Sequence, residues 1–182
     1  MLPRVRRCVR NGATKLHILS HFFPNMNRYY TVLDTNILVS GMLKVKSIPA
    51  QLLQLHEKNY LIPVFSKTIL EEYKSVLSRS KFSFSAEKVQ KLLDGIVEKG
   101  IEIHTFQQEW SRPDAADAVF FEVVMEHRKT EEQSYLVTGN LRHFPVKHFV
   151  VTPREMLMIV ANDLLHEHWL WHFLHRAGCC LP

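Results

Sequence analysis

Short apolar runs alternate along the chain with longer stretches in which apolar residues recur every three or four positions. Short runs of this kind are typical of strands, and the longer spacing is typical of helices that bury one face. The pattern predicts strands at 29–33, 60–65, 101–106, 134–138 and 148–151. It predicts helices that begin near Asn36, after Ser47, after Ser66, after Ser85, near Asp117 and after Thr152.

Strands separated by helices form a parallel sheet that is covered on both faces. We therefore expect an α/β fold, a three-layer α/β/α sandwich with a twisted, mainly parallel sheet, over residues 29–160. The third predicted strand is 101–106, and the helix after it runs from Asp117 to His127. The residues of this helix that we expect to be buried are Phe120, Phe121, Val124 and Met125.

The composition adds limits to this picture. With 182 residues, 46% hydrophobic and 23% charged, the chain has the size and content of one globular domain and not of a disordered or fibrous protein. No stretch approaches the roughly 18 consecutive apolar residues of a membrane-spanning helix, so we expect no membrane association. The three cysteines, Cys8, Cys179 and Cys180, lie near the two ends, which favours a reducing, cytoplasmic setting over a disulfide scaffold.

The positive charge is concentrated at the beginning of the chain. Six basic residues precede Asp34, the first acidic residue, and they leave 17 of the 23 basic residues to balance the 18 acids. We expect residues 1–28 to be a poorly ordered basic arm. Such an arm suits phosphate backbones or anionic surfaces. It also resembles an organelle transit peptide or sequence upstream of the true start, and an equally good reading is a disordered segment with no function of its own.

Polar residues follow several predicted strands. Asp34 follows the first strand, Asn140 follows the fourth, and Asp117 begins the helix after the third. In an open parallel sheet ligands bind at the carboxyl ends of the strands, so we expect these side chains to meet at one edge.

Two neighbouring glutamates in the helix after Ser66 differ in their expected positions. At about 100° per residue the apolar stripe of this helix is centred near Tyr73, and Glu71 lies almost opposite that centre. Glu72 lies at the edge of the stripe, where a carboxylate can point into a cleft. We therefore favour Glu72 as a site residue and Glu71 as a surface residue.

Asp114 and Asp117 are three positions apart at the start of the next helix. Both can reach one site, although an aspartate that follows a proline at a helix start is equally well explained as an N-cap. Several carboxylates at one sheet edge, with no histidine or cysteine in the pattern, favour a hard cation such as Mg²⁺ or Mn²⁺. Such an ion lowers the pKa of bound water and stabilises the leaving oxygen of a phosphodiester.

The order and spacing of these segments resemble a PIN domain, specifically the bacterial branch of toxin components in toxin–antitoxin systems. The segments that carry the resemblance are 32–40, which contains Asp34-Thr35-Asn36, the helix 69–77, 114–121, 135–140, His143-Phe144-Pro145 and 151–155. Together they extend over the whole of the predicted domain.

The resemblance implies a metal-dependent endoribonuclease. Asp34, Glu72 and Asp117 would hold Mg²⁺ or Mn²⁺ and position the attacking water, with Asp114 as a further ligand. Thr35 and Asn36 would brace the loop around Asp34, supported by Thr138 and Asn140. The implied partners are an RNA substrate, a small cognate antitoxin and a second copy of the chain in a homodimer.

One position departs from the family pattern. Asn140 stands where family members often have a further acid, and a neutral amide binds a cation less strongly. An alternative reading is therefore a catalytically weak or silent PIN-fold module that binds nucleic acid. A phosphoryl-accepting receiver domain is a third reading, but the sequence does not clearly supply the acid pair and the late lysine that it needs.

Residues 161–182 form a tail rich in His, Trp and Cys that has no counterpart in the PIN pattern. Its residues His168, His172, His175 and Cys179 are spaced as on one helix face, which makes a zinc or nickel site conceivable. Gly178 interrupts this helix, and four ligands on one straight helix cannot surround an ion. We favour an aromatic helix that docks on the domain or on a partner.

Overall fold

The computed structural model describes residues 28–104 and 115–163. In these residues five strands form one sheet, and every neighbouring pair is parallel. The strands are β1 (Tyr29–Leu33), β2 (Leu61–Phe65), β3 (Ile101–Glu102), β4 (Ser134–Val137) and β5 (Val150–Val151). Their order in the sheet is β3-β2-β1-β4-β5. The strand order reverses between β1 and β4, and ligands bind at such a switch point in open parallel sheets.

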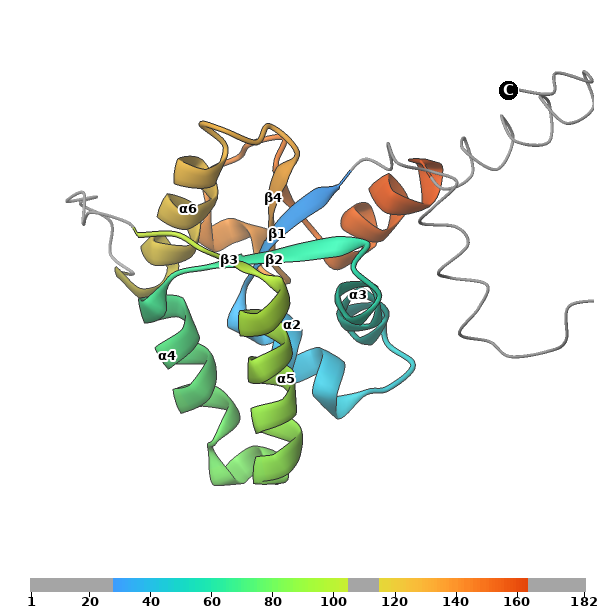
Figure 1. The fold of residues 1–182 in the computed structure, drawn as a ribbon, viewed down its shortest axis with the longest axis vertical. Coiled ribbons are helices and arrows are strands. Elements are labelled where there is room, and N and C mark those ends of the chain that lie inside the picture. The colour runs from blue at the N-terminus through green and yellow to red at the C-terminus, as the bar shows by residue number, and fades with distance from the viewer. Residues whose placement is uncertain (1–27, 105–114, 164–182) are drawn as a thin grey trace, which may run out of the picture.

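Helices cover both faces of this sheet. They are α2 (Thr35–Leu43), α3 (Ile48–Glu57), α4 (Lys67–Leu77), α5 (Ala86–Lys99) and α6 (Ala115–His127), followed by helical residues 153–163. Figure 1 shows α2, α3, α4 and α5 below the sheet and α6 above it. The predicted three-layer α/β/α sandwich is therefore confirmed. Two short 3₁₀ turns, at Ser80–Phe82 and Leu141–His143, complete the described elements.

Side-chain caps start the helices on one side of the sheet. The hydroxyls of Ser47, Ser66 and Ser85 each accept a hydrogen bond from the backbone N–H three residues further on, at 3.2, 3.3 and 3.4 Å. These bonds satisfy N–H groups that have no partner within the first helical turn. The three serines are the residues at which the sequence predicted helix starts.

The register of the two central strands places polar residues side by side at their carboxyl ends. Leu33 pairs with Val137, and the N–H of Asp34 donates to the carbonyl of Val137 at 2.9 Å. Asp34 and Thr138, the residues that directly follow β1 and β4, are therefore neighbours.

A continuous apolar core lies between the sheet and the helices. Its largest fully buried side chains include Leu38, Leu52, Ile69, Phe120 and Met156, which come from both helical layers. In the described part of the chain, no helix has the length and apolar content needed to cross a membrane.

Two details of the pattern were predicted wrongly or incompletely. Met125 was expected to be buried, but its side chain is 40% exposed. At about 100° per residue the buried face of α6 is centred between Phe120 and Val124, and Met125 lies about 120° away from it. The strand expected at 101–106 is shorter, since β3 ends at Glu102 and residues 105 and 106 lie outside the described part.

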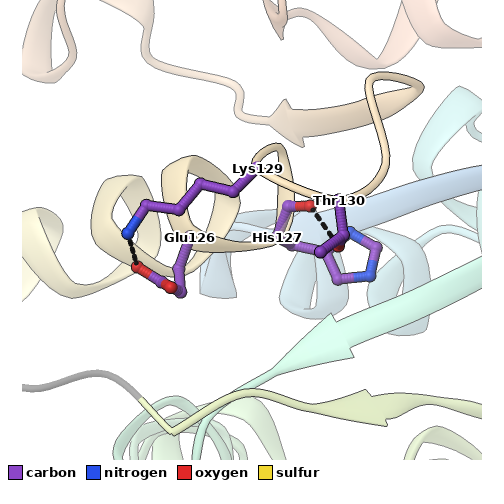
Figure 2. A network of polar contacts seen from close by, with 4 residues as sticks. All are labelled: Glu126, His127, Lys129 and Thr130. Atoms are coloured by element: carbon purple, nitrogen blue, oxygen red, sulfur yellow. Dashed lines mark hydrogen bonds and ion pairs between the residues drawn. The ribbon is translucent and has the colours of Figure 1, made fainter.

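The far end of α6 lies at the amino-terminal edge of the strands. His127 Nδ1 is 2.6 Å from the hydroxyl of Ser134, the first residue of β4. Figure 2 shows the adjoining contacts, in which the Thr130 hydroxyl donates to the His127 carbonyl at 3.1 Å and Lys129 pairs with Glu126 at 2.6 Å. This end of the helix is therefore remote from the edge that carries Asp34.

Candidate active site

The carboxylate of Asp34 is fixed by hydrogen bonds from both sides. Its Oδ1 accepts from the backbone N–H of Asn36 at 3.2 Å and so caps α2. Its Oδ2 accepts from Asn36 Nδ2 at 2.5 Å and from the Thr138 hydroxyl at 2.6 Å. The side chain is 8% exposed, and the amino-terminal end of α2 adds a favourable dipole. Asp34 is thus a nearly buried anion held in one orientation.

The segments after β1 and β4 are tied together by the amide of Asn36. While its Nδ2 donates to Asp34, its Oδ1 accepts from the backbone N–H of Gly139 at 3.2 Å. On the same segment, the N–H of Asn140 donates to the Thr138 hydroxyl at 3.0 Å. Asn36 and Thr138 therefore both orient Asp34 and hold the loop after β4.

Glu72 lies beside this cluster and is hydrogen-bonded to Thr35, the residue that follows Asp34. The Thr35 hydroxyl donates to Glu72 Oε1 at 2.5 Å, which joins the first turn of α2 to α4. Glu72 is half-buried, whereas Glu71 is exposed, as the angular argument predicted. Thr35 thus contacts Glu72, while Asn36 is the residue that braces Asp34.

The hydroxyl of Tyr73 lies in the electrostatic field of both carboxylates, Asp34 and Glu72. Its ring is buried, and its hydroxyl donates to the carbonyl of Leu33. Burial raises the pKa of the Tyr73 hydroxyl well above its ordinary value, and the negative charges of Asp34 and Glu72 raise it further. The phenol therefore stays a neutral donor under two nearby carboxylates. Sequence reasoning placed Tyr73 only in the apolar stripe, and its position next to Glu72 was the one available signal.

Comparison with known families agrees with this arrangement. A PIN domain family model matches residues 30–142, which is more than half of the chain. The chain belongs to the PIN domain family. No curated protein and no solved structure matches it. PIN domains are typically nucleases that use divalent metal ions, so the family supports a hydrolase that acts on nucleic acid.

The loop after β4 of this PIN domain carries the neutral residue Asn140. Its Nδ2 lies 2.6 Å from Nε2 of His143, within the short turn Leu141–His143. Sequence reasoning named Asn140 but missed this contact with His143, because a single 3₁₀ turn leaves no trace in the hydrophobic pattern.

Two further carboxylates, Asp117 and Asp114, were predicted for this site. Asp117 is the third residue of α6, a helix that packs against β1, β2, β4 and α4. The side chain of Asp117 and the whole of Asp114 lie outside the described residues. Among the described side chains, no group of three or more His, Cys, Asp or Glu residues is close enough to hold an ion.

The donor set nevertheless fits a hard divalent cation. Asp34 and Glu72 offer carboxylate oxygens, which Mg²⁺ and Mn²⁺ prefer. Both charges act on the buried phenol of Tyr73, so negative charge is concentrated at this point of the fold. A divalent cation offsets the repulsion that such a concentration creates.

Proposed function

We propose that this PIN domain is a Mg²⁺- or Mn²⁺-dependent endoribonuclease. The proposal is supported chiefly by two contacts near the carboxyl edge of the sheet. The hydroxyl of Thr35, the residue after Asp34, donates to Glu72, and the charges of Asp34 and Glu72 both raise the pKa of Tyr73. Asp34, Glu72 and Asp117 are the proposed ligands and catalytic residues, and Asp114 is a further proposed ligand. When bound, the ion would supply an activated water and neutralise charge on the phosphate.

The chain's own residues would prepare the site for this chemistry. Asn36 and Thr138 hold the Asp34 carboxylate, and Thr35 holds that of Glu72, so neither carboxylate must reorganise when a cation binds. Preorganised groups of this kind contribute to catalysis because no rearrangement is needed during the reaction. Tyr73 remains protonated and keeps the end of β1 in place through Leu33.

We extend the proposal to a biological role as the toxin component of a toxin–antitoxin pair. The support is the resemblance of the sequence segments to that bacterial branch. In this role the protein would be a cytoplasmic homodimer that cleaves RNA and is inhibited by a small cognate antitoxin.

The second candidate function is a catalytically weak or silent module that binds nucleic acid. Asn140 favours it, because its amide carries no negative charge at a position where a carboxylate would bind a cation more strongly. A site with one fewer negative charge holds a divalent ion less tightly, while a basic protein still attracts a phosphate backbone.

Cleavage of labelled single-stranded RNA by the full chain tests these proposals. We expect cleavage with Mn²⁺, none with EDTA, and none by Asp34→Asn, which keeps the size of the side chain and removes its charge. Glu71→Gln is the matched control and should cleave normally. Cleavage that persists in Asp34→Asn would refute the assigned site. A wild-type protein that binds RNA but leaves it intact would support the silent module.

A further inference from the structure

The connection between α4 and α5 carries a concentration of positive charge. Figure 1 shows these helices side by side, extending away from the sheet and joined at the end farthest from it. We call the segment 74–91 the hairpin tip. It contains a single acidic residue, Glu87, and five basic residues, all exposed: Lys74, Arg79, Lys81, Lys88 and Lys91.

None of these five cations forms an ion pair with an acidic residue in the described part of the chain. The ion pair found among the described residues joins Lys129 and Glu126, at the far end of α6. The tip also stands out against the chain as a whole, because from residue 29 onward basic and acidic residues nearly balance. Like charges that lie close together on a surface repel one another, so this arrangement favours an external anion.

The end of the tip is held in a defined shape. Ser83 adopts a left-handed backbone with φ of 52°, and the rings of Phe82 and Phe84 stack with centroids 5.5 Å apart and planes 15° apart. Phe84 packs against the core, and Lys81 Nζ lies 4.7 Å from the centroid of the Phe82 ring. A chain of contacts therefore runs from the core to a surface cation, which reduces the entropy lost when Lys81 binds an anion.

The tip continues directly from the candidate active site. Glu72 and Lys74 share α4, and Ser78, at the end of this helix, lies about 9 Å along the axis from Glu72. The carboxylates of the site repel the phosphates of a substrate. The cations of the tip, on α4, α5 and the turn between them, offer those phosphates a place to bind beside the site.

We propose that the hairpin tip binds the phosphate backbone of the RNA strand whose neighbouring segment enters the active site. This proposal rests on the proposed nuclease function and names the surface that holds its substrate. The cations are spread over both helix ends and the turn, which suits an extended polyanion better than one phosphate group. Phe82 and Phe84 are half-buried and stacked on each other, whereas binding to a lipid surface uses exposed apolar side chains.

The double variant Arg79→Gln/Lys81→Gln tests the surface. The matched control, Lys58→Gln/Lys129→Gln, removes the same charge from the ends of α3 and α6. Both are made in the Asp34→Asn background, and circular dichroism verifies folding. Fluorescence anisotropy then measures the dissociation constant for a labelled single-stranded RNA at several salt concentrations.

We expect the tip variant to bind RNA about 10- to 30-fold more weakly near 0.1 M salt. The slope of the logarithm of the binding constant against the logarithm of the salt concentration should fall in magnitude by about 1.4, because each of the two lost phosphate contacts removes about 0.7. The control should bind as its parent does. Equal losses in the two variants would overturn the proposal, because net charge alone would then explain them. The proposal would also be overturned if the tip variant bound RNA as its parent does but bound anionic phosphatidylserine vesicles more weakly.

The nuclease proposal can fail separately. If the otherwise wild-type chain shows no metal-dependent cleavage but the tip variant loses RNA binding, the surface stands without the enzyme. If cleavage depends on Mn²⁺ and Asp34, while Arg79→Gln/Lys81→Gln binds RNA normally in the Asp34→Asn background and cleaves it normally in the wild-type background, the enzyme stands and the surface is refuted.

Discussion

The Thr138 hydroxyl donates a 2.6 Å hydrogen bond to Asp34 Oδ2 across a sequence separation of 104 residues. The bond forms because β1 and β4 are neighbours in register, so the residues that follow them meet. The same hydroxyl accepts from the N–H of Asn140. One buried oxygen therefore links the candidate carboxylate to the loop after β4.

Replacing Thr138 with valine should weaken both stability and cleavage. Valine keeps the shape of the fully buried side chain but leaves Asp34 Oδ2 and the Asn140 N–H each without one partner. We expect the free energy of unfolding to fall by about 1–3 kcal/mol in urea denaturation. RNA cleavage should fall as well, because Asp34 loses one of the bonds that orient it. Thr138→Ser keeps the hydroxyl and should retain cleavage, and full activity in Thr138→Val would contradict this role.

Glu72→Gln and Glu71→Gln form a neighbouring pair with opposite expectations. Glu72 is half-buried and bonded to Thr35, so loss of its charge should lower the cleavage rate about 100-fold or more, as for other groups that stabilise charge in active sites. Glu71 is exposed, and its variant should differ little from wild type. The measurement is the initial rate at saturating Mn²⁺. Equal rates for the two variants would remove Glu72 from the site.

The contrast between Glu72 and Tyr73 shows what the pattern can and cannot predict. Angular position on a helix separates Glu72 from Glu71, and a strand end identifies Asp34, because both follow from local periodicity. Tyr73 was assigned to the core, and the pattern gave no sign that its hydroxyl bonds to Leu33. That contact depends on how α4 packs against the end of β1, which is a tertiary property.

Gly139→Ala should impair cleavage more than stability. A Cβ at this position would lie 3.2 Å from Asn36 Oδ1, so the Asn36 amide must move by a few tenths of an ångström. That amide also holds Asp34, and we expect a cleavage rate about three- to tenfold lower. Gly95→Ala is the control, since a Cβ there meets nothing within 4 Å in helix α5.

The control should behave in the opposite way in a stability assay. Alanine in a helix interior is favoured over glycine, so Gly95→Ala should raise the free energy of unfolding by about 0.5–1 kcal/mol and leave cleavage unchanged. If Gly139→Ala cleaves RNA at the wild-type rate, the hydrogen bonds of the Asn36 amide to Gly139 and Asp34 do not set the orientation of the Asp34 carboxylate.

His56 predicts a specific loss of stability in acid. The ring is buried in α3, and its Nε2 lies 3.0 Å from the hydroxyl of Thr31 in β1. Burial lowers the pKa of His56 to about 3, and the charge of Lys99 acts in the same direction, whereas the backbone of Leu61 opposes it. Between pH 6.5 and 3 the unfolded chain therefore binds a proton at this residue that the folded chain does not.

Stability must then fall as the pH falls through this window, by about 1.4 kcal/mol per pH unit from His56 alone. At pH 5 the loss relative to pH 7 is about 2 kcal/mol. Residue 56 of His56→Gln cannot bind a proton, so this variant lacks the loss of stability. Between pH 7 and pH 5 the free energy of unfolding of wild type should therefore fall by about 2 kcal/mol more than that of His56→Gln. Urea denaturation at both pH values measures the shift. An unchanged difference in the free energy of unfolding between pH 7 and pH 5 would show that burial of His56 does not have this effect.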